Sequence, residues 1–118
     1  MVRIGLIGYG YWGPNLARNL SELDGTRLAA CCDLNQDRLD LVARKHPDIR
    51  VTSDTQAIIN DDGIDAVVSA TPIGTHYSLA RAALLAGKHV LIEKPMATSS
   101  QEADELNAMA ADRNLTLM

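Results

Sequence analysis

The hydrophobic positions of the chain fall into short apolar runs that alternate with longer stretches of helical spacing. Residues 2–8, VRIGLIG, form the first run, which ends in glycine and is typical of a strand buried on both faces of a parallel sheet. Leu16, Leu20 and Leu23 then recur at helical spacing. The chain therefore begins with a predicted strand, a glycine-rich loop and a helix.

The same alternation continues along residues 1–118, which we expect to form one domain. Two halves of three strands each predict an α/β fold, a doubly wound parallel six-stranded sheet in the order 3-2-1-4-5-6. Ligands of such a sheet bind at the switch point between strands 1 and 4. Gly87 and the capping box of Ser99 and Glu102 mark a helix end and a helix start. The further strands are expected at residues 26–33, 49–54, 65–71, 89–95 and 115–118, and the further helices at 36–46, 55–60, 75–88 and after Ser99.

The composition narrows the class of protein. With 118 residues and 47% hydrophobic content, the chain can bury the core of one domain. Its net charge of −4 argues against a protein that binds the phosphates of a nucleic acid. No apolar stretch approaches the roughly 18 residues of a membrane span, and the start of the chain lacks the features of a signal peptide. We therefore expect a cytoplasmic protein with no membrane partner.

Cys31 and Cys32 are the only cysteines, and as neighbours they cannot link distant segments. We expect both to be small apolar residues of the strand at 26–33, because free cysteine packs as a small hydrophobe. No spacing of His, Cys, Asp and Glu suggests a metal site.

The glycine-rich loop has the pattern Gly8-x-Gly10-x-x-Gly13 between a predicted strand and a predicted helix. In a dinucleotide-binding loop the first glycine permits a tight turn, the second lets the backbone approach a pyrophosphate, and the third lets helix and strand pack closely. The backbone N–H groups around Tyr11 and Trp12 would then point at the anion, with the helix dipole behind them.

Asp33 ends the second predicted strand, 20 residues after Gly13, where a carboxylate can accept hydrogen bonds from the adenosine ribose. The same carboxylate would repel a 2′-phosphate, so NAD is favoured over NADP. Arg38, in the next predicted helix, could however bind such a phosphate. From these residues alone, S-adenosylmethionine is an alternative ligand, and a structural turn with a surface acid is another interpretation.

Residues 70–95, ATPIGTHYSLARAALLAGKHVLIEKP, carry a more specific signal. They resemble the ATP-x-x-x-H segment, the A-G-K-H-V turn and the E-K-P motif of the Gfo/Idh/MocA family of oxidoreductases. The similarity in motif order extends over essentially all 118 residues. The resemblance implies an NAD-binding Rossmann domain of an enzyme that transfers a hydride between a sugar or polyol hydroxyl and a nicotinamide cofactor.

The resemblance also implies roles for residues of this segment. Thr71 and Pro72 would line the nicotinamide side of the cleft, and Glu93 would lie near the nicotinamide ribose. Lys94 would be the catalytic lysine of the family, between the cofactor and the substrate hydroxyl. Ile73 departs from the family pattern, in which many members have asparagine at this position.

Members of the family are longer, with a second α/β domain that holds the substrate, supplies the acid and base residues and usually forms the oligomer. The present chain ends at Met118, where that domain would begin, so we expect it to bind cofactor without turnover. The loop GYGYWGPNLARN is similar to members that oxidise nucleotide-linked sugars. A non-catalytic NAD sensor or regulatory module is the alternative function. For His76 a packed or capping role is favoured over a role in the site.

Overall fold

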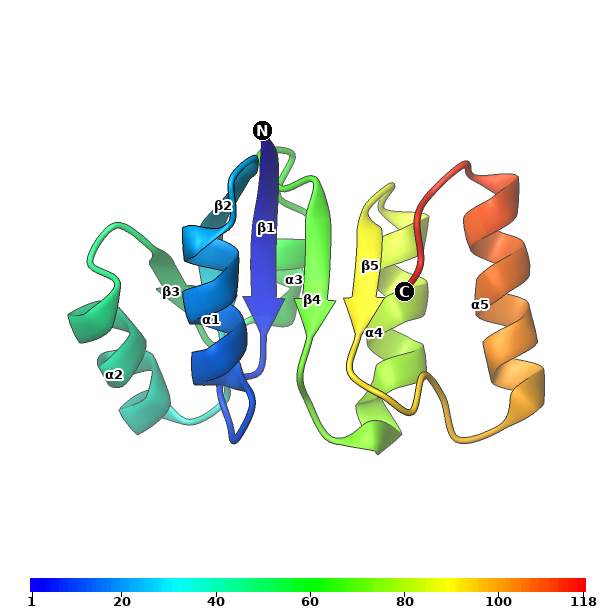
Figure 1. Cartoon of the computed structure of the whole chain (residues 1–118). Helices are drawn as coiled ribbons and strands as arrows, with labels where there is room; N and C mark the ends of the chain where they lie inside the picture. Colours follow the sequence, from blue (N-terminus) through cyan, green and yellow to red (C-terminus); the bar gives the residue numbers. More distant parts are fainter.

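The sheet of the computed structural model, which describes residues 1–118, contains five parallel strands in the order β3-β2-β1-β4-β5. All carboxyl ends of the strands therefore lie at one edge, which is the lower edge for β1, β4 and β5 in Figure 1. This arrangement confirms the predicted doubly wound parallel fold. The strands are β1 (Val2–Ile7), β2 (Thr26–Cys32), β3 (Arg50–Thr52), β4 (Ala66–Ser69) and β5 (His89–Ile92).

The predicted sixth strand is reduced to a single bridge. Leu117 pairs in parallel with Val90, beside β5 as expected. Around this bridge the N–H of Val90 donates to the Thr116 carbonyl at 2.9 Å, and the N–H of Met118 donates to the Val90 carbonyl at 3.0 Å. A strand needs consecutive bridged residues, and here only Leu117 forms a bridge, so the sheet has five strands rather than six.

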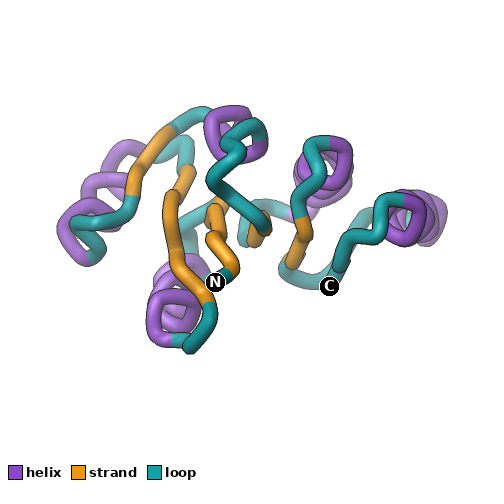
Figure 2. Tube along the Cα trace, turned by 90° about the horizontal axis from the view of Figure 1, so that it is seen from above, coloured by secondary structure: helices purple, strands orange, loops and turns teal.

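The helices cover both sides of the row of strands, as Figure 2 shows from above. In Figure 1, α1 lies in front of the sheet, whereas α3 and α4 lie behind it, with α5 beside α4. No helix combines the length and the apolar character that are needed to cross a bilayer. The helices are α1 (Gly13–Glu22), α2 (Gln36–Lys45), α3 (Thr55–Ile59), α4 (His76–Leu85) and α5 (Ser100–Asp112), with a 3-10 turn η1 (Ile73–Thr75) before α4.

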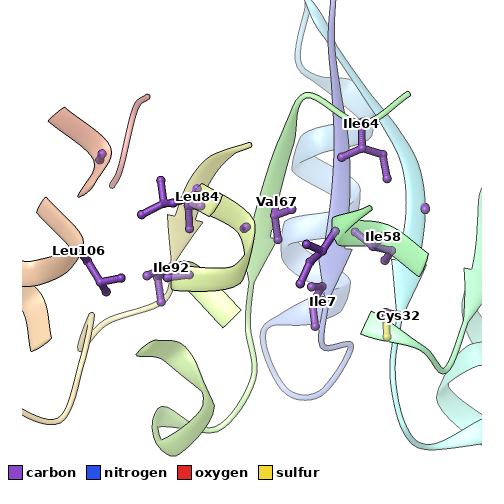
Figure 3. Packing of buried hydrophobic residues seen from close by; sticks show 14 residues of the cluster. Ile7, Cys32, Ile58, Ile64, Val67, Leu84, Ile92 and Leu106 are labelled. Carbon is purple, nitrogen blue, oxygen red and sulfur yellow. The ribbon is translucent and has the colours of Figure 1, made fainter. Parts of the chain in front are cut away.

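The alternation of side chains along β1 creates two hydrophobic layers. Ile4 and Leu6 pack on the side of α1 and α2, whereas Ile7 packs on the opposite side with residues of α3 and α4 (Figure 3). Gly5 shares the side of Ile7, and a Cβ there would lie 2.4 Å from Cγ2 of Ile58. The missing side chain at position 5 therefore lets α3 pack directly against the sheet backbone.

The two cysteines of β2 face opposite layers. Cys31 packs with the α1 and α2 side, and Cys32 packs with the α3 and α4 side. Both are free and buried, which confirms that they are apolar strand residues. A register shift against β1 leaves Ala29 without a strand partner just before them, as in a β-bulge.

The helix signals of the sequence are confirmed with one change. Gly87 has φ +81° just after α4, as a helix-ending glycine requires. The Ser99 hydroxyl oxygen accepts the N–H of Glu102 at 3.2 Å and so caps α5. The carboxylate of Glu102, however, accepts the Thr98 hydroxyl at 2.7 Å, so the predicted capping box is only half formed.

Candidate functional site

A cavity of about 760 Å³ opens at the carboxyl ends of β1, β2 and β4. This is the switch point where the sequence predicts a ligand, and the volume lies within the roughly 300–1,000 Å³ of cofactor and small-molecule sites. The cavity is lined by Ile7, Gly8, Gly10, Tyr11, Trp12, Cys32, Asp33, Leu34, Asn35, Arg38, Thr55, Ala70, Thr71, Pro72, Gly74, Thr75, Ser78 and Leu79.

Two glycines of the loop are required by the backbone itself. Gly8 has φ +99°, and a Cβ there would lie 2.6 Å from the carbonyl oxygen of Ala70. A Cβ on Gly13 would lie 3.0 Å from the carbonyl oxygen of Gly8, which brings the start of α1 close to β1. Gly13 therefore supports the loop from behind and does not line the cavity.

Gly10 is different, because its free side faces the cavity. The nearest protein atom to a Cβ there would be Nη1 of Arg38, at 3.6 Å. The protein therefore has room for a side chain at position 10, and an alanine Cβ would project into the cavity. Such a cradle fits a dinucleotide.

The start of α1 completes this end of the cavity. Trp12 is the N-cap residue of α1 and its side chain makes no capping hydrogen bond. Pro14 has no N–H, so the N–H groups of Gly13 and Asn15 are those of the first turn that can meet an anion. Tyr11 and Trp12 are exposed at the rim, with ring centroids 5.1 Å apart in an edge-to-face arrangement.

Asp33 is buried at the end of β2, although the sequence also allowed a surface acid. Its Oδ2 accepts the backbone N–H of Tyr9 at 2.8 Å, and its Oδ1 accepts the N–H of Asn35 at 2.8 Å. Each carboxylate oxygen keeps a second lone pair for a further donor. Asp33 thus anchors the glycine loop and still offers two acceptor positions on the cavity wall.

Arg38 places a positive charge on the same wall. Its Nη1 lies 3.6 Å from Oδ2 of Asp33, and half of its side chain is exposed. The guanidinium therefore partly neutralises the buried carboxylate while it keeps donors free. This end of the cavity therefore holds charges of both signs.

A chain of three hydroxyl groups supports another wall, where Thr71 and Thr75 line the cavity and Ser69 is buried. The Thr75 hydroxyl donates to the carbonyl of Pro72 at 2.7 Å, so Thr75 Oγ1 must accept its bond from the Thr71 hydroxyl. The Thr71 oxygen in turn accepts from Ser69 at 3.0 Å. Because every proton of the chain is used inside the protein, Thr71 and Thr75 offer only lone pairs to a ligand. This wall therefore suits a ligand that donates hydrogen bonds.

Glu93 and Lys94 follow β5 at the same edge of the sheet, but they do not line the cavity. The N–H of Glu93 donates to the carbonyl of Ser69 at 3.0 Å, so this segment lies directly beside the end of β4. Lys94 is exposed. Ile73 lies in η1 and is partly exposed near the cavity rim.

His76 is buried at the start of α4, which confirms the packed role that the sequence favours. Its Nδ1 lies 2.7 Å from the carbonyl oxygen of Pro95, and its Nε2 lies 2.7 Å from that of Thr71. Both partners are main-chain acceptors in loops that carry predicted site residues.

The sequence did not predict several residues of the cavity. Asn35 follows Asp33 by two positions before a helix, and this spacing is a usable signal because aspartate commonly binds the backbone N–H two residues on. No local pattern marks Thr75 or Ser78, because they reach the cavity only through the fold of η1 and α4.

Comparison with known proteins agrees with this geometry. Residues 2–118 match the family model described as "Oxidoreductase family, NAD-binding Rossmann fold" (GFO_IDH_MocA). The chain is 32% identical over 117 residues to scyllo-inositol 2-dehydrogenase (NADP(+)) IolW of Bacillus subtilis, covering 98% of this chain and 32% of that protein. It is 42% identical over 100 residues to inositol 2-dehydrogenase of Acidothermus cellulolyticus, covering 84% of this chain and 29% of that protein.

A solved structure shows the same fold. The chain superposes on apo scyllo-inositol dehydrogenase from Lactobacillus casei with a TM-score of 0.91 and 28% sequence identity, over 100% of this chain and 36% of that one. The chain thus spans about a third of the length of the proteins that it matches.

Proposed function

This chain belongs to the Gfo/Idh/MocA oxidoreductase family with an NAD-binding Rossmann fold, and we propose that its cavity binds NAD for hydride exchange with a sugar or polyol hydroxyl. One observation carries the proposal. The open side of Gly10, the free N–H groups of α1 and the acceptor positions of Asp33 line one cavity at the switch point of the sheet. Together they match the pyrophosphate and the ribose of a dinucleotide.

Each part of the site has a distinct task. The N–H groups at the start of α1 bind the pyrophosphate, helped by the positive end of the helix dipole. The two acceptor positions of Asp33 bind the adenosine ribose hydroxyls. The lone pairs of Thr71 and Thr75 accept the carboxamide N–H₂ of the nicotinamide, next to Pro72. The bound cofactor supplies the hydride acceptor.

We propose NAD rather than NADP as the preferred cofactor. A buried carboxylate at the ribose position repels a 2′-phosphate, and Asp33 is held there by two backbone N–H groups. Arg38 weakens this repulsion because its guanidinium lies 3.6 Å from the carboxylate. The Bacillus subtilis relative is described as NADP-linked, so both cofactors occur among similar proteins.

Lys94 is proposed as the residue that meets the substrate, with Glu93 near the nicotinamide ribose. An exposed ammonium at the carboxyl end of β5 can donate a hydrogen bond to the substrate hydroxyl and orient it. The names of two relatives point to inositols as the first polyols to assay. A nucleotide-linked sugar is the alternative substrate. The rest of the substrate pocket and the acid and base residues are proposed to lie outside this chain.

A fluorescence titration tests the cofactor proposal, because Trp12 is the only tryptophan and lies on the cavity rim. NADH is expected to quench it, with weaker responses to NADPH and none to S-adenosylmethionine. Asp33→Asn should weaken NADH binding at least about tenfold, since it removes hydrogen bonds to a charged group. Binding of S-adenosylmethionine, or of none of the three ligands, would contradict the proposal.

A further inference from the structure

The backbone on both sides of Lys94 is held by other parts of the site. On one side the N–H of Glu93 donates to the carbonyl of Ser69 at 3.0 Å. On the other side the carbonyl of Pro95 accepts a hydrogen bond from Nδ1 of His76 at 2.7 Å. Lys94 itself is exposed, so these two backbone points set where its side chain starts.

The second nitrogen of His76 reaches the cavity wall. Its Nε2 lies 2.7 Å from the carbonyl oxygen of Thr71. The hydroxyl of the same residue is hydrogen-bonded to that of Thr75 on the cavity wall. One ring therefore joins the loop after β4 to the loop after β5. The ring is 2% exposed, so packing leaves it little freedom to turn away from either carbonyl.

Polarity as well as volume matters at this position. Carbonyl oxygens only accept hydrogen bonds, so each ring nitrogen of His76 holds its carbonyl only when it carries a proton, and the two bonds form together only when both nitrogens do. An apolar side chain of similar size would fill the space but leave the Pro95 and Thr71 carbonyls without this partner. Both bonds are partly buried, so the loss of their donor would destabilise this arrangement, and the loops would move to find water or other donors.

We propose that His76 is a positioning residue. Through the carbonyl of Pro95 it fixes the backbone of Lys94 relative to the cavity wall at Thr71. The link to hydride transfer rests on the proposed function of Lys94. The placement of the loop by His76 stands on the two hydrogen bonds and the burial of the ring.

Two matched variants separate the two nitrogens of the ring. In His76→Asn the side-chain amide can take the place of Nδ1 and donate to Pro95. In His76→Gln it can take the place of Nε2 and donate only to Thr71. The N–H of Glu93, which donates to the carbonyl of Ser69, should exchange hydrogen about five- to tenfold faster in the Gln variant, and near the wild-type rate in the Asn variant. Equal exchange in both variants overturns the proposal.

A second measurement follows Lys94 itself by NMR after ¹³C-methylation of the lysines. The chain has three lysines, and Lys94→Arg assigns the signal. NADH should shift the Lys94 signal in the wild type and in His76→Asn, and shift it less than half as much in His76→Gln. Equal shifts in both variants overturn the positioning role. If NADH changes neither this signal nor Trp12 fluorescence, the proposed function fails while the exchange result still decides the role of His76.

The wild-type chain keeps the proposal testable if both variants unfold. The proposal requires a slowly exchanging Nδ1–H resonance of His76 in the NMR spectrum of the wild-type chain. The absence of that resonance overturns the proposal. His89 provides the internal contrast, because its Nδ1 accepts the N–H of Thr116 at 3.0 Å and therefore carries no proton.

Discussion

The backbone N–H of Tyr9 donates to Oδ2 of Asp33 at 2.8 Å, across 24 positions of sequence. This bond joins the glycine loop after β1 to the end of β2. The other carboxylate oxygen holds the N–H of Asn35, so one side chain shapes two loops of the site. A residue expected only to meet a ribose therefore also builds the loop that is proposed to meet the pyrophosphate.

Replacement of Asp33 should therefore cost stability even without cofactor. Asp33→Ala removes two hydrogen bonds to a charged group, each worth about 1.5–3 kcal/mol, whereas Asp33→Asn keeps one acceptor oxygen. We expect urea denaturation to rank the unfolding free energies as wild type, then Asn, then Ala. Asp48→Ala, at an exposed position, should change the unfolding free energy by less than about 0.5 kcal/mol. An Asp33→Ala chain as stable as wild type would contradict the anchoring role.

Gly10→Ala separates binding from folding. The nearest atom to the new Cβ is 3.6 Å away, so the unfolding free energy should stay within about 0.5 kcal/mol of wild type. The affinity for NADH, measured by Trp12 fluorescence, should fall at least about tenfold, or 1.4 kcal/mol. Gly8→Ala is the contrast, because strain at φ +99° should cost more than about 1 kcal/mol of stability. Full NADH affinity in Gly10→Ala would show that the pyrophosphate binds elsewhere.

Lys88 holds a turn of the fold through a buried ammonium. The side chain is 6% exposed, and Nζ donates to the carbonyls of Asp61 at 2.6 Å and Ile64 at 2.7 Å. Lys88→Met keeps the length of the side chain but removes both bonds of the ammonium, although the Asp61 carbonyl keeps the N–H of Ile64 at 3.0 Å, so the unfolding free energy should fall by about 2–3 kcal/mol. The matched control Lys45→Met, at an exposed position, should lower the unfolding free energy by less than about 0.5 kcal/mol. Urea titrations of the two variants, run side by side, decide the point.

Tyr9 carries the one buried side-chain polar atom without a hydrogen-bond partner, its hydroxyl. Burial raises the pKa of this phenol, as expected for a group that is costly to ionise. Tyr9→Phe removes the unpaired group, so thermal or urea unfolding should show unchanged stability or a gain of about 1 kcal/mol. Tyr77→Phe should instead lower stability, because it loses the 2.6 Å bond to Glu105. A marked loss in Tyr9→Phe would mean that its hydroxyl has a partner in solution.

The two buried thiols should make the protein sensitive to alkali. Burial raises the pKa of Cys31 to about 12 and that of Cys32 to about 11, above the roughly 8.5 of an exposed thiol. Above pH 9 the unfolded chain therefore loses thiol protons that the folded chain keeps. The unfolding free energy should fall by up to about 1.4 kcal/mol per pH unit for each thiol, until the folded-state pKa is reached.

Urea midpoints at pH 8, 9 and 10 measure this slope. Cys31→Ala and Cys32→Ala should each flatten it, whatever their effect on stability at pH 8. Slopes that do not change in either variant would assign the alkaline sensitivity to other groups, of which Tyr9 is the first candidate.

The sequence predicts the fold well where the deciding features are close together in the chain. Gly87 ends α4 and Ser99 caps α5 because each acts on its own helix terminus. The apolar runs identify β1, β2, β4 and β5, which are buried between two helical layers, and the sequence also predicts β3 although its residues are exposed or half-buried. The sixth run, residues 115–118, has strand-like composition, but only Leu117 forms a bridge, although Thr116 and Met118 also hydrogen-bond to β5. Composition alone does not report how many residues of a run are paired.

The sequence predicts part of the cavity lining but not the contacts between its loops, and the expected residues Gly13, Glu93 and Lys94 do not line the cavity. Gly8, Gly10 and Asp33 lie on the cavity wall at the expected switch point. The hydrogen bond from His76 to Pro95 spans 19 positions, and no local sequence pattern around either residue predicts it. Contacts between loops of different strands depend on the completed sheet, so no periodic pattern records them.

Cys31 and Cys32 give the molecule two natural reporters in adjacent positions, one in each hydrophobic layer. A chain that keeps only one of them reports, by the rate of thiol labelling, when the layer around that cysteine first admits solvent. Equal labelling rates would mean that the α1–α2 layer and the α3–α4 layer open together. Unequal rates would order the two layers along the unfolding path, without any engineered probe.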